Sequence, residues 1–482
     1  MRGQLVVDLP LHLDREAPLG LTAQLVGALR LLVDEGRLHQ HDALPSSRAL
    51  AANLGLSRGT VVAAYDQLQA EGYLVAAAGS GTRVGAAVRP TQSAARPARS
   101  PVSARGLPAP VDLRPGTPDV SAIVSPPWRQ AWRKAASHPA TVIDPLGLPA
   151  LRTEIAEHLR LMRSLVRPTD QVLVTSGARE GLALLLDCLA NRKGRLLVGV
   201  EQPGHPALSE VPGALGIDTL PLTTDEHGLV TSALPTDQGG RPDLVVVTPS
   251  HQYPNGGSLS LARRQELLTW AARTGALLVE DDYDSELRYV GMPLPALATL
   301  DDPASGCVVL LGTFSTVLTP AVATGYLVAP AALVPLLGAH RAAAGLPTPA
   351  LVQQALADYL ASGELRRHIQ RMRRDYRRRR ALIVERLGSL PGARLAPLAG
   401  GLHAVVHTSR PGRTVSAELA AQHILVGELA DYWGPHSPDV RGIVFGFGAV
   451  APDTLSRVLP AIARSCSADE RPVDAPRDER IS

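Results

Sequence analysis

The sequence contains almost no lysine. Of its 48 basic side chains only two are lysines, Lys134 and Lys193, which leaves 46 arginines. Lys134 lies in a helical pattern, and Lys193 lies in a turn-like segment that ends at Gly194. Any chemistry that needs a lysine amine, such as Schiff-base formation, therefore has two candidate side chains in the chain.

Cysteines, aromatic residues and long apolar runs are also scarce. Three widely spaced cysteines, Cys188, Cys307 and Cys466, show no metal-ligand spacing and fit buried thiols in a reducing cytosol. Aromatic residues make up 3% of the chain, so leucine, valine and alanine must fill the cores. No apolar run approaches the 18 residues of a membrane span, and the N-terminus lacks the layout of a signal peptide. We expect a cytoplasmic protein with no membrane partner.

The chain of 482 residues is long enough for about three domains of ~150 residues. Its first part predicts three helices. Apolar residues recur at helical spacing from Leu21 to Val33. Ser46 can cap a short helix that Gly55 ends, and Ser57 can cap the next helix, which runs to about residue 70. Two short helices joined this closely have the layout of a helix-turn-helix.

Two short strands then follow, at 73–75 and 82–84, around a Gly-Ser-Gly turn. Residues 15–85 resemble the winged helix-turn-helix of the GntR family of DNA-binding proteins. The matching motifs are Leu-Pro-Ser-Ser-Arg at 44–48, Leu-Ala-Ala-Asn-Leu-Gly-Leu-Ser-Arg-Gly-Thr-Val at 50–61, Glu-Gly-Tyr at 71–73 and Gly-Ser-Gly-Thr at 79–82.

The resemblance implies that this part binds double-stranded DNA, with the second helix in the major groove and the wing near the minor groove. The residues expected to contact DNA are Ser46, Arg48, Ser57, Arg58, Gly59, Thr60, Gly81 and Thr82. Gly59 departs from the asparagine common in the family, which leaves base preference open. Residues 1–85 contain seven arginines and eight acidic residues, so the electrostatic attraction of this part to DNA is weak. A helix-turn-helix kept only for protein contacts is the alternative.

Residues 86–111 are rich in arginine, proline and alanine and contain no acid, which predicts a linker. From residue 112 to about 340, strand-like and helical segments alternate, which predicts a doubly wound α/β sheet with its site at the strand C-termini. A smaller C-terminal α+β domain is expected at 341–466, with a strand at 443–447 as its final element, and a disordered tail at 467–482. Nine arginines between Arg366 and Arg380 suggest either a nucleic-acid patch or a solvated helix face, and we favour the second.

Five further motifs resemble the fold-type I aminotransferases, which use pyridoxal phosphate (PLP). They are Asp-Pro-Leu-Gly-Leu-Pro-Ala-Leu-Arg at 144–152, Thr-Ser-Gly-Ala at 175–178, Thr-Pro-Ser-His-Gln-Tyr-Pro-Asn-Gly at 248–256, Glu-Asp-Asp-Tyr-Asp-Ser-Glu at 280–286 and Gly-Thr-Phe-Ser at 312–315. A GntR-type reader ahead of such a domain resembles the MocR (GabR-like) bacterial transcription regulators. Members of that family bind PLP, sense a small amine or the cofactor, and are usually head-to-tail dimers.

The resemblance assigns some residues to the cofactor pocket. Asp281 matches the carboxylate that pairs with the pyridine nitrogen, and Tyr283 matches a phenol near the ring hydroxyl. The phosphate cup matches Ser176, Gly177, Ala178 and Ser315, and Tyr253 joins the same pocket.

Other family residues are missing. Thr316 stands at the position of the Schiff-base lysine, and Ala323 at that of an arginine. His205 replaces a ring-stacking tyrosine, and Ala207 an arginine kept by some relatives. Since an alcohol cannot form an imine, PLP could bind only non-covalently, and no aldimine is expected.

The sequence therefore predicts a transcription regulator and not an enzyme. Its aminotransferase-like domain would serve as the homodimerisation and effector module, for an operator and an effector that remain unidentified. A working aminotransferase with an appended DNA reader is one alternative. A heterodimer partner of an intact homologue is the other.

Overall fold

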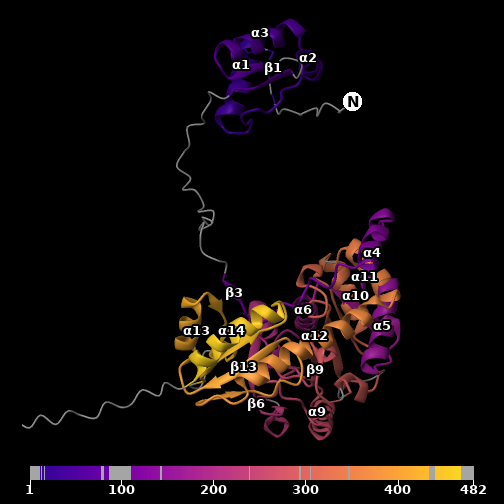
Figure 1. The fold of residues 1–482 in the computed structure, drawn as a ribbon. Coiled ribbons are helices and arrows are strands. Elements are labelled where there is room, and N and C mark those ends of the chain that lie inside the picture. The colour runs from indigo at the N-terminus through magenta and orange to yellow at the C-terminus, as the bar shows by residue number, and fades with distance from the viewer. Residues whose placement is uncertain are drawn as a thin grey trace, which may run out of the picture. The chain divides into compact units, whose positions relative to one another are not determined.

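The computed structural model describes residues 11–467 except 12, 16, 78–80, 86–109, 142–143, 238, 292–294, 304–305, 346–347 and 434–439 (Figure 1). The chain divides into two compact units, Met1–Leu107 and Pro108–Ser482. Almost all of the expected linker and tail lies outside the described residues, so those two predictions stay predictions.

The described residues of unit 1 form three helices and a two-stranded antiparallel ribbon. The Ser46 hydroxyl accepts a hydrogen bond from the Ala49 amide (3.2 Å), and the Ser57 hydroxyl accepts one from the Thr60 amide (3.1 Å). Gly55 ends its helix at φ +62°, a left-handed conformation that favours glycine. The predicted caps are confirmed. The elements are α1 (Leu21–Asp34), α2 (Ser47–Leu54), α3 (Arg58–Ala70), β1 (Leu74–Ala77) and β2 (Gly81–Val84).

The core of unit 1 joins one face of each helix to the ribbon. Leu29, Val61 and Leu68 are all at most 1% exposed, and Leu74 and Val84 bring the two strands into the same cluster. Because α2 and α3 are fixed by this core, their exposed residues are held in one arrangement.

Unit 2 is built on an eight-stranded sheet in the order β4-β11-β10-β9-β8-β5-β6-β7. Strands β10, β9, β8, β5 and β6 are parallel, whereas β11 is antiparallel to both of its neighbours. The predicted α/β class with a large sheet is confirmed, and the direction of β11 was not foreseen. The strands are β4 (Val172–Thr175), β5 (Leu197–Gln202), β6 (Asp218–Asp225), β7 (Gly228–Leu229), β8 (Leu244–Val247), β9 (Leu277–Asp282), β10 (Val308–Thr313) and β11 (Gly325–Val328).

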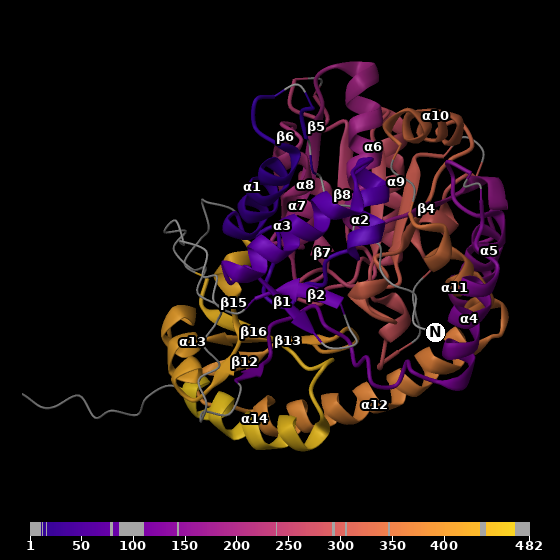
Figure 2. The ribbon, with the colours of Figure 1, turned by 90° about the horizontal axis from the view of Figure 1, so that it is seen from above.

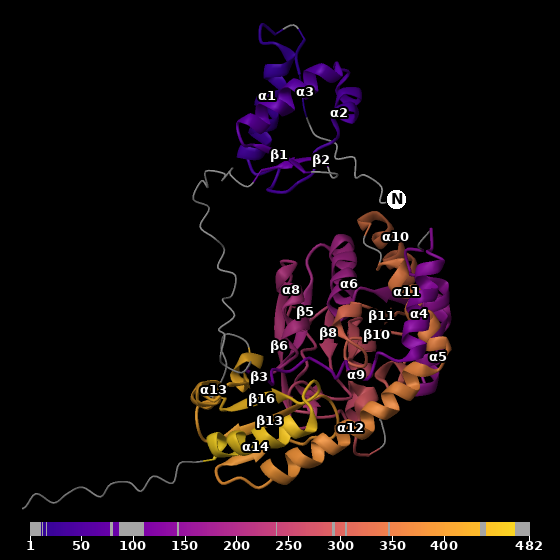
Figure 3. The same cartoon turned by 45° about the horizontal axis from the view of Figure 1, so that its top comes forward.

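Helices cover both faces of this sheet (Figure 3). In β8, Leu244 and Val246 pack in a cluster with α6, α7, α8 and α10, while Val245 and Val247 pack in a cluster with α4, α5, α9 and α11. Successive side chains of a strand point to opposite faces, so a strand buried on both faces reads as a continuous apolar run. The helices are α4 (Pro126–Ser137), α5 (Pro149–Arg163), α6 (Ala178–Lys193), α7 (Pro206–Ser209), α8 (Val211–Ala214), α9 (Leu261–Thr274), α10 (Val334–Ala344) and α11 (Ala350–Ala361).

The C-terminal part of unit 2 holds an antiparallel sheet in the order β12-β13-β16-β15, with α12 packed against α14 (Figure 2). A short parallel pair, β3 with β14, ties the start of the unit to this part. The elements are β3 (Val111–Asp112), α12 (Glu364–Leu387), β12 (Ala393–Leu395), β13 (His403–Thr408), α13 (Gly412–Ala421), β14 (Ile424–Leu425), β15 (Gly427–Glu428), β16 (Gly442–Gly446) and α14 (Pro452–Cys466).

Four expectations are corrected. The strand near 443–447 does not end the C-terminal part, because α14 follows it. The α12 arginines are not all solvated, since Arg379 is 4% exposed and pairs with Asp119 at 2.6 Å. Lys193 ends helix α6 and is not in a turn, and Cys307 is only half-buried.

Candidate functional site

A cavity of about 370 Å³ opens in unit 2 where β4, β9 and β10 end. The carboxyl ends of parallel strands are where α/β sheets place their ligands. All nine pocket residues expected from the sequence line it, as does Ala207. The nine are Ser176, Gly177, Ala178, His205, Tyr253, Asp281, Tyr283, Ser315 and Thr316.

Asp281 forms the acidic floor of the cavity. It is 3% exposed, and its Oδ2 atom has no hydrogen-bond partner among the described residues. Burial raises the pKa of Asp281 well above its ordinary value, and the neighbouring carboxyls of Asp282 and Asp284 raise it further. A buried oxygen without a partner is rare in proteins, and it fits a ligand atom that donates a hydrogen bond.

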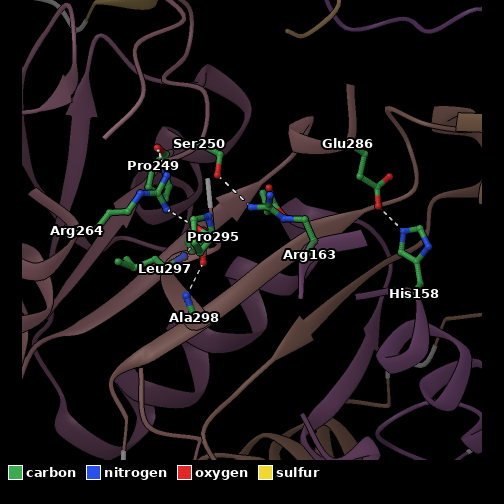
Figure 4. A network of polar contacts seen from close by, with 11 residues as sticks. His158, Arg163, Pro249, Ser250, Arg264, Glu286, Pro295, Leu297 and Ala298 are labelled. Carbon is green, nitrogen blue, oxygen red and sulfur yellow. Dashed lines mark hydrogen bonds and ion pairs between the residues drawn. The ribbon is translucent and has the colours of Figure 1, made fainter. Parts of the chain in front are cut away.

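The residues on either side of Asp281 belong to a separate network of polar contacts. Figure 4 shows the partners Arg163, Leu297 and Ala298 in that network. Glu280 is fully buried and accepts hydrogen bonds from the amides of Leu297 (2.8 Å) and Ala298 (2.9 Å). Arg163 donates to Asp282 at 2.8 Å, with both side chains 3% exposed. Alternation along β9 thus directs Asp281 to the cavity and its neighbours to a network that fixes the strand.

Tyr283 is held by residues that the site prediction did not include. Its hydroxyl lies 3.0 Å from the His251 carbonyl oxygen and 2.9 Å from the His251 Nδ1. The same Nδ1 lies 2.7 Å from Asp284 Oδ2. Both His251 and Asp284 stand inside the motifs at 248–256 and 280–286, but only the folded chain brings the two loops together.

Aromatic rings form one wall. His205 lies 4.6 Å from Tyr253, ring centre to ring centre, and Tyr253 lies 4.6 Å from His403. Burial lowers the pKa of His205 and of His403 to about 4 each, so both rings are neutral at pH 7. His403 lines the cavity, and sequence reasoning missed it because it comes from β13, about 120 residues beyond Tyr283.

The expected phosphate cup, at the N-terminus of α6, is partly filled by the protein itself. The Ser176 amide donates to Glu180 Oε2 at 2.8 Å, and the Ser176 hydroxyl lies 3.2 Å from that of Thr348. Glu180 also pairs with Arg341. A helix N-terminus favours one anion, and here a carboxylate already takes one of its amides.

The cavity fits one part of a PLP molecule and not the others. Asp281 offers an unpaired oxygen for a ring nitrogen. Thr316 and Ala323 line the cavity but supply neither an amine nor a cation. Both lysines form ion pairs elsewhere, Lys134 with Asp358 and Lys193 with Asp243, and neither lines the cavity.

In unit 1, the eight residues expected to contact DNA are all at least partly exposed. Ser46, Arg48, Ser57, Arg58, Gly59 and Gly81 are exposed, and Thr60 and Thr82 are half-buried. The Thr60 hydroxyl lies 2.8 Å from that of Ser57, at the first turn of α3. Gly81 takes φ +88° at the start of β2. Their contact with DNA stays a prediction.

Two negative findings apply to the part of the chain that is described. No helix there is long and apolar enough to cross a membrane, and no group of three or more His, Cys, Asp or Glu is arranged to hold a metal ion.

Two families match the chain. Residues 21–84 match the family described as "Bacterial regulatory proteins, gntR family", and residues 111–434 match "Aminotransferase class I and II". The chain is 47% identical to the HTH-type pyridoxine biosynthesis transcriptional regulator PdxR of Corynebacterium glutamicum, over 96% of this chain and 100% of that protein. It is 31% identical to the probable rhizopine catabolism regulatory protein MocR of Rhizobium meliloti, over 92% and 93%.

Aminotransferases are among the solved structures with the same fold. The kynurenine aminotransferase of Pyrococcus horikoshii matches with a TM-score of 0.66 at 21% identity, over 74% of this chain and 91% of that one. The multiple substrate aminotransferase of Thermococcus profundus matches with a TM-score of 0.66 at 22% identity, over 75% and 92%. At such identity the likeness shows the fold alone.

Proposed function

The chain belongs to the MocR-like family of HTH-type transcriptional regulators, in which a GntR-type reader precedes an aminotransferase class I and II domain, and on that premise we propose how this member works. It is a DNA-binding transcription regulator. Its aminotransferase-like domain serves as dimerisation and effector module without Schiff-base chemistry and does not transfer amino groups.

One observation carries the proposal. The cavity keeps its acidic floor and its aromatic wall, while Thr316 stands where the reacting amine would be. An alcohol cannot condense with an aldehyde to an imine, and neither lysine lines the cavity. PLP could bind here only non-covalently, through Asp281 and what remains of the cup. When bound, PLP supplies an electron sink for reactions of amino acids, and this chain offers no covalent link to it.

In unit 1, α3 acts as the recognition helix in the major groove. Arg58 reaches base edges or phosphate from the first turn, and Arg48 contacts phosphate from α2. The wing, with Gly81 at its tip, approaches the minor groove. Because residues 1–85 have little net charge, specificity depends on these few contacts more than on bulk attraction.

A footprinting experiment tests the reader. The first target is DNA upstream of pyridoxine biosynthesis genes, since a relative 47% identical over nearly the whole chain carries that name. Arg58→Ala should weaken specific binding by about 1–3 kcal/mol, while Arg195→Ala, an exposed arginine of unit 2, should leave binding unchanged. If the wild-type protein, in the presence of competitor DNA, protects no specific sequence there or upstream of its own gene, the proposed DNA-binding function is wrong.

We further propose a homodimer in the cytoplasm, with each reader on one half-site. Sedimentation of the pure chain gives its oligomeric state. Footprints that form only when a lysine-bearing homologue is added would replace the homodimer by a heterodimer. Transfer of an amino group from any amino acid to an oxo acid would show the alternative, a working aminotransferase.

A further inference from the structure

A small chamber adjoins the main cavity beside Asp281. It has a volume of about 20 Å³ and is lined by Glu201, His205, Thr248 and Asp281 among others. His205 and Asp281 also line the main cavity, so the two spaces share a wall. About 10–15 Å³ of such volume accommodates one water-sized group, so the chamber suits a single nitrogen or oxygen atom.

Three buried polar atoms belonging to residues of this chamber lack a hydrogen-bond partner among the described residues: Glu201 Oε1, His205 Nδ1 and Asp281 Oδ2. Glu201 is 6% exposed, and its other oxygen is held by the Thr248 amide (3.2 Å) and hydroxyl. Buried polar atoms are almost always paired, so three unpaired ones at one chamber indicate a missing donor. The two carboxyl oxygens and the neutral imidazole nitrogen could all accept hydrogen bonds from one ligand group that donates several.

The two spaces are lined by more acidic side chains than permanent cations. Thr316 and Ala323 remove the two cations expected from the family resemblance. Among the described lining residues, Arg179 is the only permanent cation, and it is exposed. Asp284 adds a third acid, which His251 holds at 2.7 Å. A phosphate dianion would meet these acids with almost no compensating charge.

The wall supplies the second element of amine recognition. Tyr253 and Tyr283 lie 5.8 Å apart, ring centre to ring centre, and His205 lies 5.8 Å from Tyr283. Aromatic rings attract one another, so this wall suits the ring of a ligand, and the neutral imidazole of His205, which lines both spaces, does not repel a nearby cation.

Building on the proposed effector module, we propose that the cavity binds a phosphate-free aromatic amine as its cation, with the protonated nitrogen in the chamber between Asp281 and Glu201. The aromatic ring of the amine then lies in the main cavity against His205 and Tyr253. Binding is non-covalent, and protons released by the two carboxyls go to solvent.

Calorimetric titration of the full chain with matched probes tests the proposal. Pyridoxamine and pyridoxamine 5′-phosphate differ only in the phosphate, and benzylamine and benzyl alcohol differ in the cation. We expect pyridoxamine to bind at least ten-fold more tightly than its phosphate, and benzylamine at least ten-fold more tightly than benzyl alcohol. Tighter binding of the phosphate, equal binding of amine and alcohol, or no binding of either amine at millimolar concentration would overturn the proposal.

Variants locate the site. Asp281→Asn and Glu201→Gln should each weaken amine binding at least ten-fold, whereas Glu226→Gln on the surface should not change it. Since the first two are buried, circular dichroism must show wild-type folding. If either folds normally and binds the amines as wild type does, the nitrogen lies elsewhere and the proposal is wrong. The double variant Thr316→Lys with Ala323→Arg restores both cations and should reverse the preference towards the phosphate.

The outcome separates this proposal from the proposed function. DNA footprints in the absence of any amine test the reader alone. If the footprints form while no amine binds, the proposed DNA-binding function is supported and the proposed class of effector is wrong.

Discussion

The two units differ in how many of the functional residues expected from their families they contain. In unit 1, the helix caps Ser46 and Ser57 and the exposed Arg48 and Arg58 are all in place. In unit 2 the floor at Asp281 is retained, while Thr316 and Ala323 line the cavity without an amine or a cation.

The difference follows from what each residue does for folding. The strand that carries Asp281 is fixed by two buried side chains, Arg163, which pairs with Asp282, and Glu280, which accepts from two backbone amides, so changes there destabilise the domain. Thr316 is half-buried and Ala323 exposed at the cavity edge, where a lost cation leaves no buried partner unpaired. The fold can therefore be stable without the lysine and the arginine that aminotransferase chemistry uses.

The largest expected effect breaks unit 2 alone. Arg163→Met removes the partner of Asp282, at 2.8 Å and 3% exposure, and leaves buried acids without a cation. We expect a loss of about 3–5 kcal/mol in the unfolding free energy of unit 2. Chemical denaturation followed by tryptophan fluorescence measures it, because all four tryptophans lie in unit 2. Arg195→Ala, a 90% exposed arginine, is the control and should change little.

The matching change breaks unit 1 alone. Leu68→Ala empties a site that is 1% exposed in the helical core and should cost about 2–5 kcal/mol. DNA binding should be lost while the tryptophan transition of unit 2 stays in place. If that transition moves together with unit 1, the two units do not fold independently, and the comparison between them fails.

A pH effect sharpens the account of the chamber. Burial raises the pKa of Glu201 to about 7, so between its unfolded value near 4.5 and 7 the folded state holds a proton that the unfolded state has lost. Stability therefore falls as pH rises through this window, by up to about 3 kcal/mol. Glu201→Gln should flatten the melting temperature of unit 2 between pH 5 and 8. An unchanged slope would place the titrating group elsewhere.

The smallest expected effect comes from substitutions of Ser57, which distinguish its role in stability from its role in DNA binding. Ser57→Ala removes the cap of α3 and should cost about 1 kcal/mol. Ser57→Asp keeps a cap but adds a negative charge where phosphate is expected, so it should restore stability and weaken DNA binding. Melting curves and gel-shift titrations of both variants distinguish the two roles. Equal DNA binding by Ser57→Asp and wild type would remove Ser57 from the interface.

Much of this could be predicted because it is local. Caps depend on neighbours three residues apart, and β4 and β8 read as apolar runs ending in polar loops. The nine cavity residues are predicted from the family resemblance, and eight of them lie within or directly after the motifs at 175–178, 248–256, 280–286 and 312–315.

The rest depends on contacts between distant segments. The antiparallel direction of β11 is set by pairing with β4 and β10, and the burial of Arg379 by Asp119, 260 residues away. The chamber at Glu201 forms because β5, β8 and β9 are neighbours in the sheet. No local sequence pattern predicts which distant segments come into contact.

The most direct test of the central claim is reaction of the full chain with pyridoxal phosphate, followed by borohydride and peptide mass mapping. The account predicts no visible absorption band from a bound imine and no stoichiometric adduct, beyond slow surface labelling of Lys134, Lys193 or the N-terminus. Thr316→Lys should gain the band and an adduct at residue 316. A stoichiometric adduct on the wild-type chain that changes its footprint on DNA would contradict the account.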